Sequence, residues 1–471
     1  MIFQKKLEVH VFGATLLIPC SLDGPMGDIP LEKMPKILHG KQTELALSNF
    51  QISGRTLQRE FVLAQLMTKK ASALANTELG LLEEDIAQSI VQACDMASEK
   101  DFLKHFKIDV YQAGAGTSQN MNVNEVVACL ATRLLQKDVH PNDHVNMLQS
   151  TNDTIPTAAQ IACLFSMNEK LVPSIEGLFW TFKNKAREYS HLVKSGRTHM
   201  QDAVIMEWKD VFNAWSSHLE VSLDRLKYCE RSLLEVPLGG NAVGNGANAP
   251  ANYRISVVNR LREVTGMDVI PSKDAVALTE NPVSFLHLAS SLSETAVALS
   301  RISSDVIVLS SGPRTGLQEL LLKPLQAGSS FMPGKVNPVM AEMLVMACCQ
   351  VQGHTHAVKC GMERGMLELN VTMPMMAWNL LDAINILSRA VSSFDKKCAV
   401  HMMVNEDKSR ESAYSSLGGI TALVPVFGYD ECARLAGISR DLSAPLDEVV
   451  AREHNVSIEQ ARLMLRGERF G

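Results

Sequence analysis

The chain has 471 residues, of which 46% are hydrophobic and 20% are charged. This composition is typical of a folded globular protein and excludes a disordered or fibrous one, while the length predicts two or three structural units. The formal net charge of −6 leaves no strongly basic surface for nucleic acid, so we expect a small-molecule partner.

The first twenty residues loosely resemble a secretory signal, because Lys5 and Lys6 precede an apolar run from Val11 to Cys20. Glu8 and His10 lie between the basic pair and that run, and no Ala-x-Ala cleavage site follows, so the pattern does not favour a signal. The ten cysteines form no Cys-x-x-Cys pair and no disulfide-like spacing. They predict reduced thiols and a cytoplasmic protein.

Three long stretches lack both glycine and proline, which helix interiors exclude, and they predict long helices. They run from Asp202 to Val236, from Val283 to Ser311 and from Met375 to Leu417. The second carries a stripe spaced alternately by three and four residues, apolar except for one threonine: Phe285, Leu288, Leu292, Thr295, Leu299, Ile302, Val306 and Leu309. This spacing is typical of a helix packed lengthwise against others.

The predicted fold is therefore mainly α, with a central bundle of long helices and short or absent strands. Strand and helix periods do not alternate, which argues against a doubly wound sheet. We predict a mixed, mostly helical domain over 1–155, the long-helix bundle over 156–404 and a small helical C-terminal domain over 405–471.

Four polar, glycine-containing segments interrupt the predicted helices, and loops at helix ends are where a site can be assembled. They are AGAGTSQNMNVNE at 113–125, QSTNDTIPTA at 149–158, SGRTHMQDA at 195–203 and GSSFMPGKVNP at 328–338. Taken alone, Thr117 in the first segment and the Ser150, Thr151 and Asn152 run in the second are typical of helix caps. In the second segment we expect the helix to begin near Pro156, a favoured first-turn residue.

The third segment adds an imidazole, His199, beside the hydroxyl of Thr198, although a lone histidine is more often structural than catalytic. His140 and His144 are four residues apart but lack a third ligand, so no metal site is expected. A Ser-His-Asp hydrolase is also conceivable, but the sequence contains no Gly-x-Ser-x-Gly elbow.

The fourth segment differs from a phosphate-binding P-loop, because five residues separate Gly328 from Gly334 and Val336 stands where a magnesium-binding hydroxyl is required. It combines hydroxyl groups, an amine and an amide, which belong to Ser329, Ser330, Lys335 and Asn337. Such a loop can supply a base and an anion partner, since an amine or backbone amides favour the alkoxide of a serine.

Together and in this order, the four segments resemble the motifs of the aspartase/fumarase superfamily. GSSFMPGKVNP is similar to its signature, Gly-Ser-Ser-x-Met-Pro-x-Lys-x-Asn-Pro, and the resemblance runs from about Gln42 to Tyr429. Within the superfamily, LSSGPRTGLQE, LQAGSS, GMLELNV and the DAV that follows the histidine motif are similar to aspartate ammonia-lyase forms.

The resemblance implies an anti elimination from a dicarboxylate that gives fumarate, with Ser329 as the base. It implies that Lys335 and Asn337 hold one carboxylate. The other, reacting carboxylate would be held by Thr117, Ser150, Thr151 and Ser330, and the leaving group would be surrounded by Asn152, Thr198 and His199. The resemblance also implies that no cofactor is needed, and a homotetramer whose sites take residues from three chains.

The sequence departs from the superfamily pattern at several positions. Leu45 stands where the usual Gln-Thr-x-Arg-Ala has its arginine, and Asn241 and Asn245 stand where threonines are common. Four functions stay open: an ammonia-lyase for L-aspartate, a fumarate hydratase, a lyase for another amino- or substituted succinate, and an idle binding homologue on the same fold. The intact signature loop speaks against the last.

Overall fold

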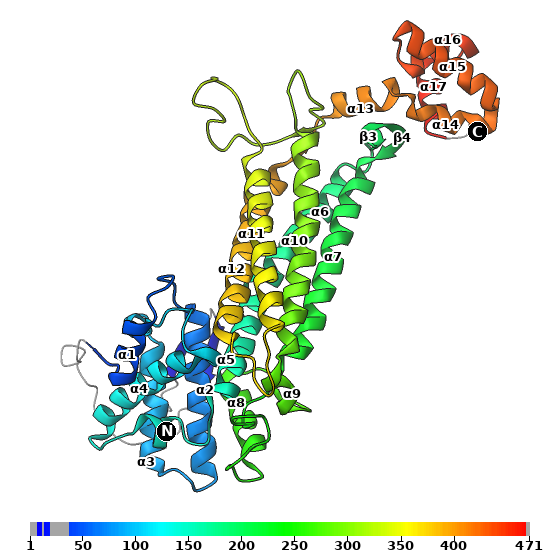
Figure 1. The fold of residues 1–471 in the computed structure, drawn as a ribbon. Coiled ribbons are helices and arrows are strands. Elements are labelled where there is room, and N and C mark those ends of the chain that lie inside the picture. Colours follow the sequence, from blue (N-terminus) through cyan, green and yellow to red (C-terminus); the bar gives the residue numbers. More distant parts are fainter. Residues whose placement is uncertain (1–6, 12–13, 19–36, 468–471) are drawn as a thin grey trace, which may run out of the picture. The chain divides into compact units, whose positions relative to one another are not determined.

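The structure is a computed structural model that describes residues 7–11, 14–18 and 37–467 (Figure 1). The predicted mainly α class is confirmed, since helices supply most of the described residues. The chain forms two compact units, the first from Met1–Pro173, Asp224–Ala296 and Cys349–Ser388, the second from Ser174–Leu223, Val297–Cys348 and Arg389–Gly471. The three-domain division of the sequence stays a prediction.

The first unit is built around helix α2. Its shorter helices are α1 (Lys41–Asn49), α2 (Arg59–Glu78), α3 (Glu84–Ser98), α4 (Thr117–Leu135), α5 (Thr151–Ser166), α8 (Tyr253–Thr265) and α9 (Ala275–Glu280). Helix α2 packs against α3, α5 and α8, and α3 packs against α4. Buried side chains such as Ile90, Val123 and Leu130 fill the space between α2, α3 and α4. The short strands β5 (Glu235–Val236) and β6 (Ile270–Pro271) pair in parallel.

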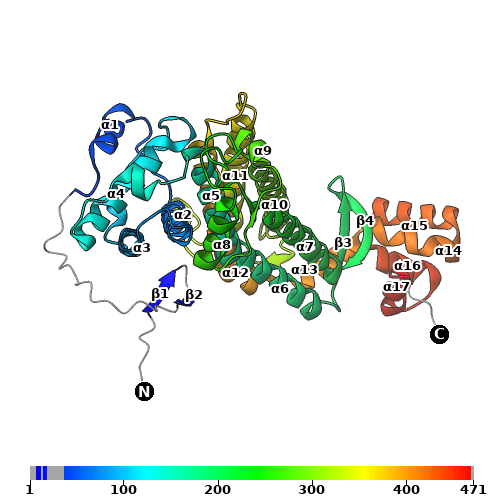
Figure 2. The same ribbon diagram turned by 90° about the horizontal axis from the view of Figure 1, so that it is seen from below.

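Four long helices contribute to both units: α7 (Trp208–Leu233), α10 (Val283–Leu309), α11 (Val339–Met362) and α12 (Met373–Lys397). Within the first unit they lie side by side (Figure 2). The hydroxyl of Ser293 on α10 donates to Gln352 on α11 at 2.6 Å, and the His354 ring on α11 lies 2.7 Å from the Asn379 amide oxygen on α12. These contacts are those of a lengthwise bundle.

The predicted stripe of α10 is confirmed by its burial. Seven of its members, from Phe285 to Val306, are fully buried, and Leu309 at the end of the helix is half-buried. Thr295, the polar one of these seven, donates its hydroxyl to the carbonyl of Ser291 one turn earlier at 2.8 Å. A threonine is tolerated in this stripe because its own helix satisfies the hydroxyl.

The second unit contains a hairpin and a cluster of short helices. Its elements are α6 (Val172–Glu188), whose first two residues belong to the first unit, β3 (Val193–Thr198), β4 (Gln201–Glu207), β7 (Leu320–Leu321), β8 (Met403–Val404), α13 (Glu406–Ser415), α14 (Ile420–Phe427), α15 (Tyr429–Leu442), α16 (Leu446–His454) and α17 (Ile458–Leu465). Strands β3 and β4 pair antiparallel, as do β7 and β8. Buried residues including Leu423, Leu435 and Val450 form the core of the helical cluster.

Two of the three predicted helix spans are wrong in their extent. Residues 201–207 form strand β4, so the helix predicted from Asp202 begins only at Trp208. The span from Met375 to Leu417 is divided, because α12 ends at Lys397 and α13 begins at Glu406. Asn405 caps the new helix by accepting the backbone N–H of Lys408 at 3.3 Å, and such a side-chain cap starts a helix without glycine or proline. The span from Val283 is confirmed as α10.

The segment that loosely resembles a signal contains strands β1 (Leu7–Val11) and β2 (Ala14–Ile18), which pair antiparallel. Lys5, Lys6 and Cys20 lie outside the described residues. Across residues 7–11, 14–18 and 37–467, no helix is both long enough and apolar enough to cross a membrane.

A buried ion-pair network holds strand β3 of the β3–β4 hairpin. The Glu319 carboxylate is 1% exposed and accepts two hydrogen bonds from the Arg197 guanidinium, at 2.7 and 3.1 Å, while the Lys194 amine lies 3.4 Å away. Ser412 on α13 donates to the same carboxylate at 2.7 Å. Burial raises the pKa of Glu319, but Arg197, Lys194 and Ser412 outweigh it, so the pKa lies below its ordinary value.

We expect Glu319→Gln to destabilise the protein by about 3–5 kcal/mol at pH 7, because the two cations then lose their buried partner. The folded-state pKa of Glu319 is lowered, so the ionised carboxylate stabilises the folded state above about pH 4.5. This stabilisation is lost as the pH falls through the folded-state pKa. Urea unfolding should therefore show a difference in the free energy of unfolding between wild type and variant that becomes smaller below pH 4.5. Glu411→Gln, which removes the exposed partner of Lys408, is the matched control and should change little. A difference in unfolding free energy that is the same at all pH values would contradict the stabilising role of the ionised Glu319 carboxylate.

Candidate functional site

The second motif forms the start of helix α5. Ser150 is the N-cap, and its hydroxyl oxygen accepts the backbone N–H of Asn152 at 3.2 Å. Asp153 completes a capping box by accepting the Ser150 N–H at 3.0 Å. The prediction that this helix begins near Pro156 is therefore wrong, because the helix begins at Thr151 and Pro156 lies inside it.

Asp153 also ties the second motif to a loop more than eighty residues later in the chain. Its fully buried carboxylate accepts the backbone N–H groups of Gly239 at 3.1 Å and Asn241 at 2.9 Å. Burial raises the pKa of Asp153 to about 7, against the lowering effect of these hydrogen bonds. Asn152 adds a further contact, because its side-chain amide donates to the carbonyl of Ala242 at 2.8 Å. The motif and the loop therefore form one structural piece.

The two asparagines that depart from the superfamily pattern have local structural roles in this loop. Asn241 adopts a φ of +59°, a left-handed conformation that asparagine tolerates better than threonine, and its amide donates to the Ala247 carbonyl at 3.0 Å. The Asn245 side chain accepts the N–H of Ala247 at 3.1 Å. Both side chains thus stabilise the turn.

The first motif opens helix α4. Thr117 is its first residue and is exposed, and its hydroxyl donates to the Gly114 carbonyl at 3.1 Å. The polar side chains that follow are buried inside the unit, among them Gln119 and Asn120. The amide of Asn120 donates to the Thr151 hydroxyl oxygen at 3.3 Å, so the first and second motifs meet.

The third motif forms the tip of the β3–β4 hairpin. Thr198 pairs with Gln201, which leaves a two-residue turn of His199 and Met200 with φ values of 55° and 60°. Both are left-handed, as in a type I′ turn. Thr198, His199 and Met200 are all exposed. The hairpin therefore presents the imidazole and the Thr198 side chain at the surface of the second unit.

The fourth motif is a loop with a closed neck. Gly328 donates its N–H to the Lys335 carbonyl at 2.9 Å, and the Asn337 amide donates to the Gly328 carbonyl at 2.8 Å. A side chain at Gly328 would place its Cβ 2.3 Å from the Lys335 carbonyl oxygen, so only glycine fits. Ser330 inside the loop and Lys335 at its neck are both exposed.

Ser329 lies just inside this neck, and its hydroxyl is bonded within the loop. Its oxygen accepts two backbone N–H groups, from Phe331 at 3.1 Å and Met332 at 3.0 Å. Two donors aimed at one oxygen stabilise negative charge on it. This geometry suits a serine that loses its proton.

The chain places the predicted site residues in two groups. Thr117, Ser150, Thr151 and Asn152 belong to the first unit, whereas Thr198, His199, Ser329, Ser330, Lys335 and Asn337 belong to the second. Within the second unit, no hydrogen bond or ion pair joins the described residues 198–199 to the described loop 328–338.

Sequence reasoning missed the supporting residues Asp153 and Glu319. The first carried a signal, since Ser-x-x-Asp before an apolar run is a capping-box pattern. Glu319 carried none, because its partners Arg197 and Ser412 lie about a hundred residues away on either side.

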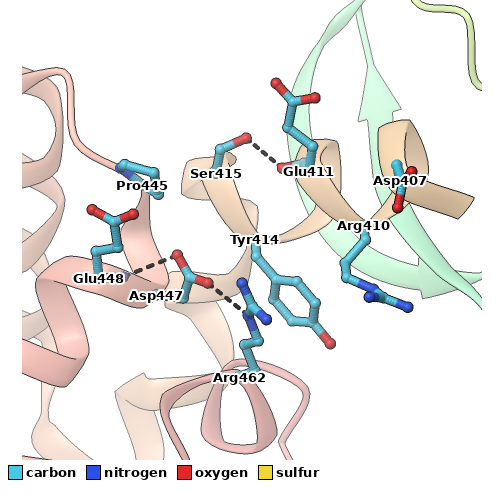
Figure 3. Close-up of a pocket in the computed structure, with 9 residues that line it drawn as sticks. All are labelled: Asp407, Arg410, Glu411, Tyr414, Ser415, Pro445, Asp447, Glu448 and Arg462. Atoms are coloured by element: carbon cyan, nitrogen blue, oxygen red, sulfur yellow. Dashed lines mark hydrogen bonds and ion pairs between the residues drawn. The ribbon is translucent and has the colours of Figure 1, made fainter. Parts of the chain in front are cut away.

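A cavity of about 280 Å³ in the C-terminal helices of the second unit contains none of these residues (Figure 3). Asp447 and Arg462 in its wall form an ion pair of 2.7 Å, and the Arg462 guanidinium covers the Tyr414 ring. In the described part of the chain, no group of three or more His, Cys, Asp or Glu side chains could hold a metal ion.

Comparisons with known proteins agree with the motifs. A family model described as "Lyase" matches residues 32–353. An aspartate ammonia-lyase from Pseudomonas canavaninivorans is 40% identical over 432 residues, which cover 90% of this chain and 91% of that protein. A class II fumarate hydratase from Xylella fastidiosa is 37% identical over 443 residues, 93% of each chain.

Solved structures give the same result for the fold. The crystal structure of fumarate lyase:delta crystallin from Brucella melitensis bound to cobalt has a TM-score of 0.88 and 36% identity, and the match covers 92% of this chain and 96% of that one. Both the sequence and the fold thus match over nearly the whole length. The chain is an enzyme of the lyase class and belongs to the aspartase/fumarase superfamily.

Proposed function

We propose that the protein catalyses the reversible elimination of ammonia from L-aspartate to give fumarate. The observation that carries this proposal is the hydroxyl of Ser329, which receives two backbone N–H groups within a loop that also carries Lys335. A serine can act as a base only if its alkoxide is stabilised, and these donors supply that stabilisation.

In the proposed reaction, Ser329 takes the proton from the carbon beside the β-carboxylate. The electrons of the broken C–H bond move into that carboxylate, and the resulting dianion expels ammonia as the carbon–nitrogen bond breaks. Thr117, Ser150, Thr151 and Ser330 hold the reacting carboxylate, and Lys335 and Asn337 hold the other. Because the groups at the reacting carboxylate are neutral, they can favour the developing charge without a fixed cation that would overstabilise the substrate.

The leaving amine is placed near Asn152, Thr198 and His199 in this proposal. Of these, the Asn152 amide nitrogen already donates to Ala242, which orients its side-chain oxygen as the free acceptor for an ammonium group. Thr117 must rotate its hydroxyl away from the Gly114 carbonyl before it can donate to a substrate.

Fumarate hydratase is the second candidate, supported by class II fumarate hydratase relatives at 37% identity over 93% of the chain. The aspartate ammonia-lyase relatives, at 40% identity, and the aspartase-like DAV and LQAGSS forms favour ammonia as the leaving group. A lyase for another amino- or substituted succinate is a third candidate, motivated by Asn241 and Asn245.

Incubation of the purified protein with L-aspartate should release fumarate and ammonia in equal amounts. Fumarate is followed by its ultraviolet absorbance and ammonia by a coupled assay. L-malate is the control substrate and should give at least a hundredfold slower release of fumarate. Malate turnover without aspartate turnover would establish the hydratase instead, and turnover confined to a panel of other substituted succinates would establish the third candidate.

Ser329→Ala should lower kcat by at least a thousandfold while the affinity for succinate, a dicarboxylate that cannot eliminate, changes by less than a few fold. The hydroxyl is assigned to proton removal and not to recognition. Lys335→Ala is the contrasting variant: it should weaken succinate binding about tenfold or more, because a charge-assisted hydrogen bond is lost. Substantial turnover by Ser329→Ala would remove this residue as the base.

We further propose a homotetramer whose sites combine segments of three chains. Large apolar side chains are exposed on three of the long helices: Val221 and Tyr228 on α7, Val297 on α10 and Met346 on α11, each between 57% and 67% exposed. These side chains are available to pack against helices of other chains in the proposed tetramer.

Shared sites make inactive variants complementary. Chains carrying Thr151→Val and chains carrying Ser329→Ala should each be nearly inactive, yet dissociation, mixing and reassembly should restore part of the activity, since some sites then receive only intact segments. Light scattering should show mixed tetramers, and each variant reassembled alone is the control. Activity that stays at the level of the separate variants in proven mixed tetramers would mean that each site is built within one chain.

A further inference from the structure

The first unit contains a buried cation that the proposed reaction does not use. Lys69 on helix α2 is fully buried, and its amine donates to the side-chain oxygens of Asn146 at 2.8 Å and Gln149 at 3.0 Å. Its neighbour Lys70 instead pairs with the half-exposed Asp95 at 2.8 Å. A buried ammonium group is costly, and burial lowers the pKa of Lys69 to about 7. Its position therefore requires a physical explanation.

The negative charge of Asp153 does not explain why Lys69 is buried. The Asp153 carboxylate raises the pKa of Lys69, but it is already satisfied by the backbone N–H groups of Ser150, Gly239 and Asn241. No hydrogen bond or ion pair joins Lys69 to Asp153, both of which lie within the described residues. The direct partners of the lysine are the two neutral amides.

These amides begin a chain of hydrogen bonds that ends at the second motif. The Asn146 side-chain oxygen accepts from Lys69 and also from the Asn120 amide nitrogen, at 3.1 Å. The same nitrogen of Asn120 lies 3.3 Å from the Thr151 hydroxyl oxygen. On its other side, the Asn120 oxygen accepts from Gln65 at 3.4 Å. Both ends of the Asn120 amide are therefore engaged.

The direction of this chain is set by Lys69 together with the Gln149 carbonyl, which accepts a hydrogen bond from the Asn146 amide nitrogen at 3.2 Å. An ammonium group can only donate, so the Asn146 oxygen must face Lys69. Asn120 must then present its nitrogen to that oxygen, and the same nitrogen faces Thr151. Even a neutral amine keeps two hydrogens for its two bonds, so the direction persists when Lys69 loses its proton.

At the end of the chain, the Thr151 oxygen accepts a hydrogen bond and its own hydrogen is left to donate. The Ser150 oxygen accepts the Asn152 N–H in the same manner. In the described part of the chain, no protein atom accepts a hydrogen bond from either hydroxyl. Two adjacent hydroxyls with free hydrogens are suited to bind a carboxylate, which can only accept.

We propose that Lys69 is a positioning residue that acts through Asn146 and Asn120 to hold the Thr151 hydroxyl as a donor to the substrate carboxylate. This inference rests on the proposed function, in which Thr151 binds the reacting carboxylate. It assigns to Lys69 no contact with substrate and no part in proton transfer.

A double-mutant cycle tests the proposal, with calorimetric succinate affinity and the KM and kcat for aspartate as readouts. Lys69→Met removes the donor at similar length, and Thr151→Val removes the hydroxyl at similar shape. Each should weaken succinate binding about five- to tenfold, the loss of one hydrogen bond. The double variant should bind no more weakly than Thr151→Val alone, because both changes remove the same interaction. Losses that multiply, or an unchanged affinity of Lys69→Met, would overturn the proposal.

Asn120→Leu tests the same chain if Lys69→Met does not fold, and it should show the same non-additivity with Thr151→Val. Gln160→Leu is the matched control: it removes another buried amide, on the same helix as Thr151, whose bonds lead to Glu235 and Ser284. It should lower the Tm but leave succinate affinity unchanged. If Gln160→Leu weakens succinate binding as much as Asn120→Leu does, the loss of affinity is explained by general destabilisation and the proposal is overturned.

The outcomes for the two proposals are distinct. Wild-type protein that binds succinate but does not convert aspartate would contradict the proposed function alone, and the affinity cycle would still test the Lys69 chain. Wild-type protein that binds no dicarboxylate would overturn both.

Discussion

The buried carboxylate of Asp153 is the group on which the first unit's part of the candidate site depends. It accepts three backbone N–H groups, one at the cap of helix α5 and two from the loop at 239–241. Backbone donors buried without a partner are costly, so this carboxylate determines both where α5 begins and where the loop lies. The next residue, Asp153, accepts the backbone N–H groups of both segments, and this holds Ser150, Thr151 and Asn152 in place.

The sequence predicts the parts of the fold that depend on local pattern. The α10 stripe is correct because burial of one helix face requires that spacing, and Gly-free and Pro-free runs do mark helices. The rule that a run without glycine and proline marks a helix fails at 201–207. There the hairpin turns through His199 and Met200 at positive φ without the usual glycine or asparagine. Absence of helix breakers cannot show where a strand or a side-chain cap takes over.

In the candidate site, too, only the residues that belong to local motifs could be predicted from the sequence. Its outward-facing residues lie in short motifs that are visible in the sequence, but its supporting residues are joined over long separations. Lys69 contacts Asn146 and Gln149, nearly eighty residues away, and only its place on α2 distinguishes it from Lys70. Adjacent helix residues face directions about 100° apart, so one lysine enters the core and the other pairs near the surface.

In the proposed reaction, the two units supply negative-charge stabilisation in different ways. In the second unit, Ser329 depends on backbone N–H groups, whose positions are fixed by a loop neck that only glycine can close. In the first unit, hydroxyl groups are proposed to bind the carboxylate, and a hydroxyl can rotate, so its direction must be imposed by neighbours. A cation placed directly on the reacting carboxylate would bind substrate and intermediate alike. In the proposed arrangement, Lys69 lies two amides away from Thr151, which retains the direction that the cation imposes and leaves a neutral donor at the reacting end.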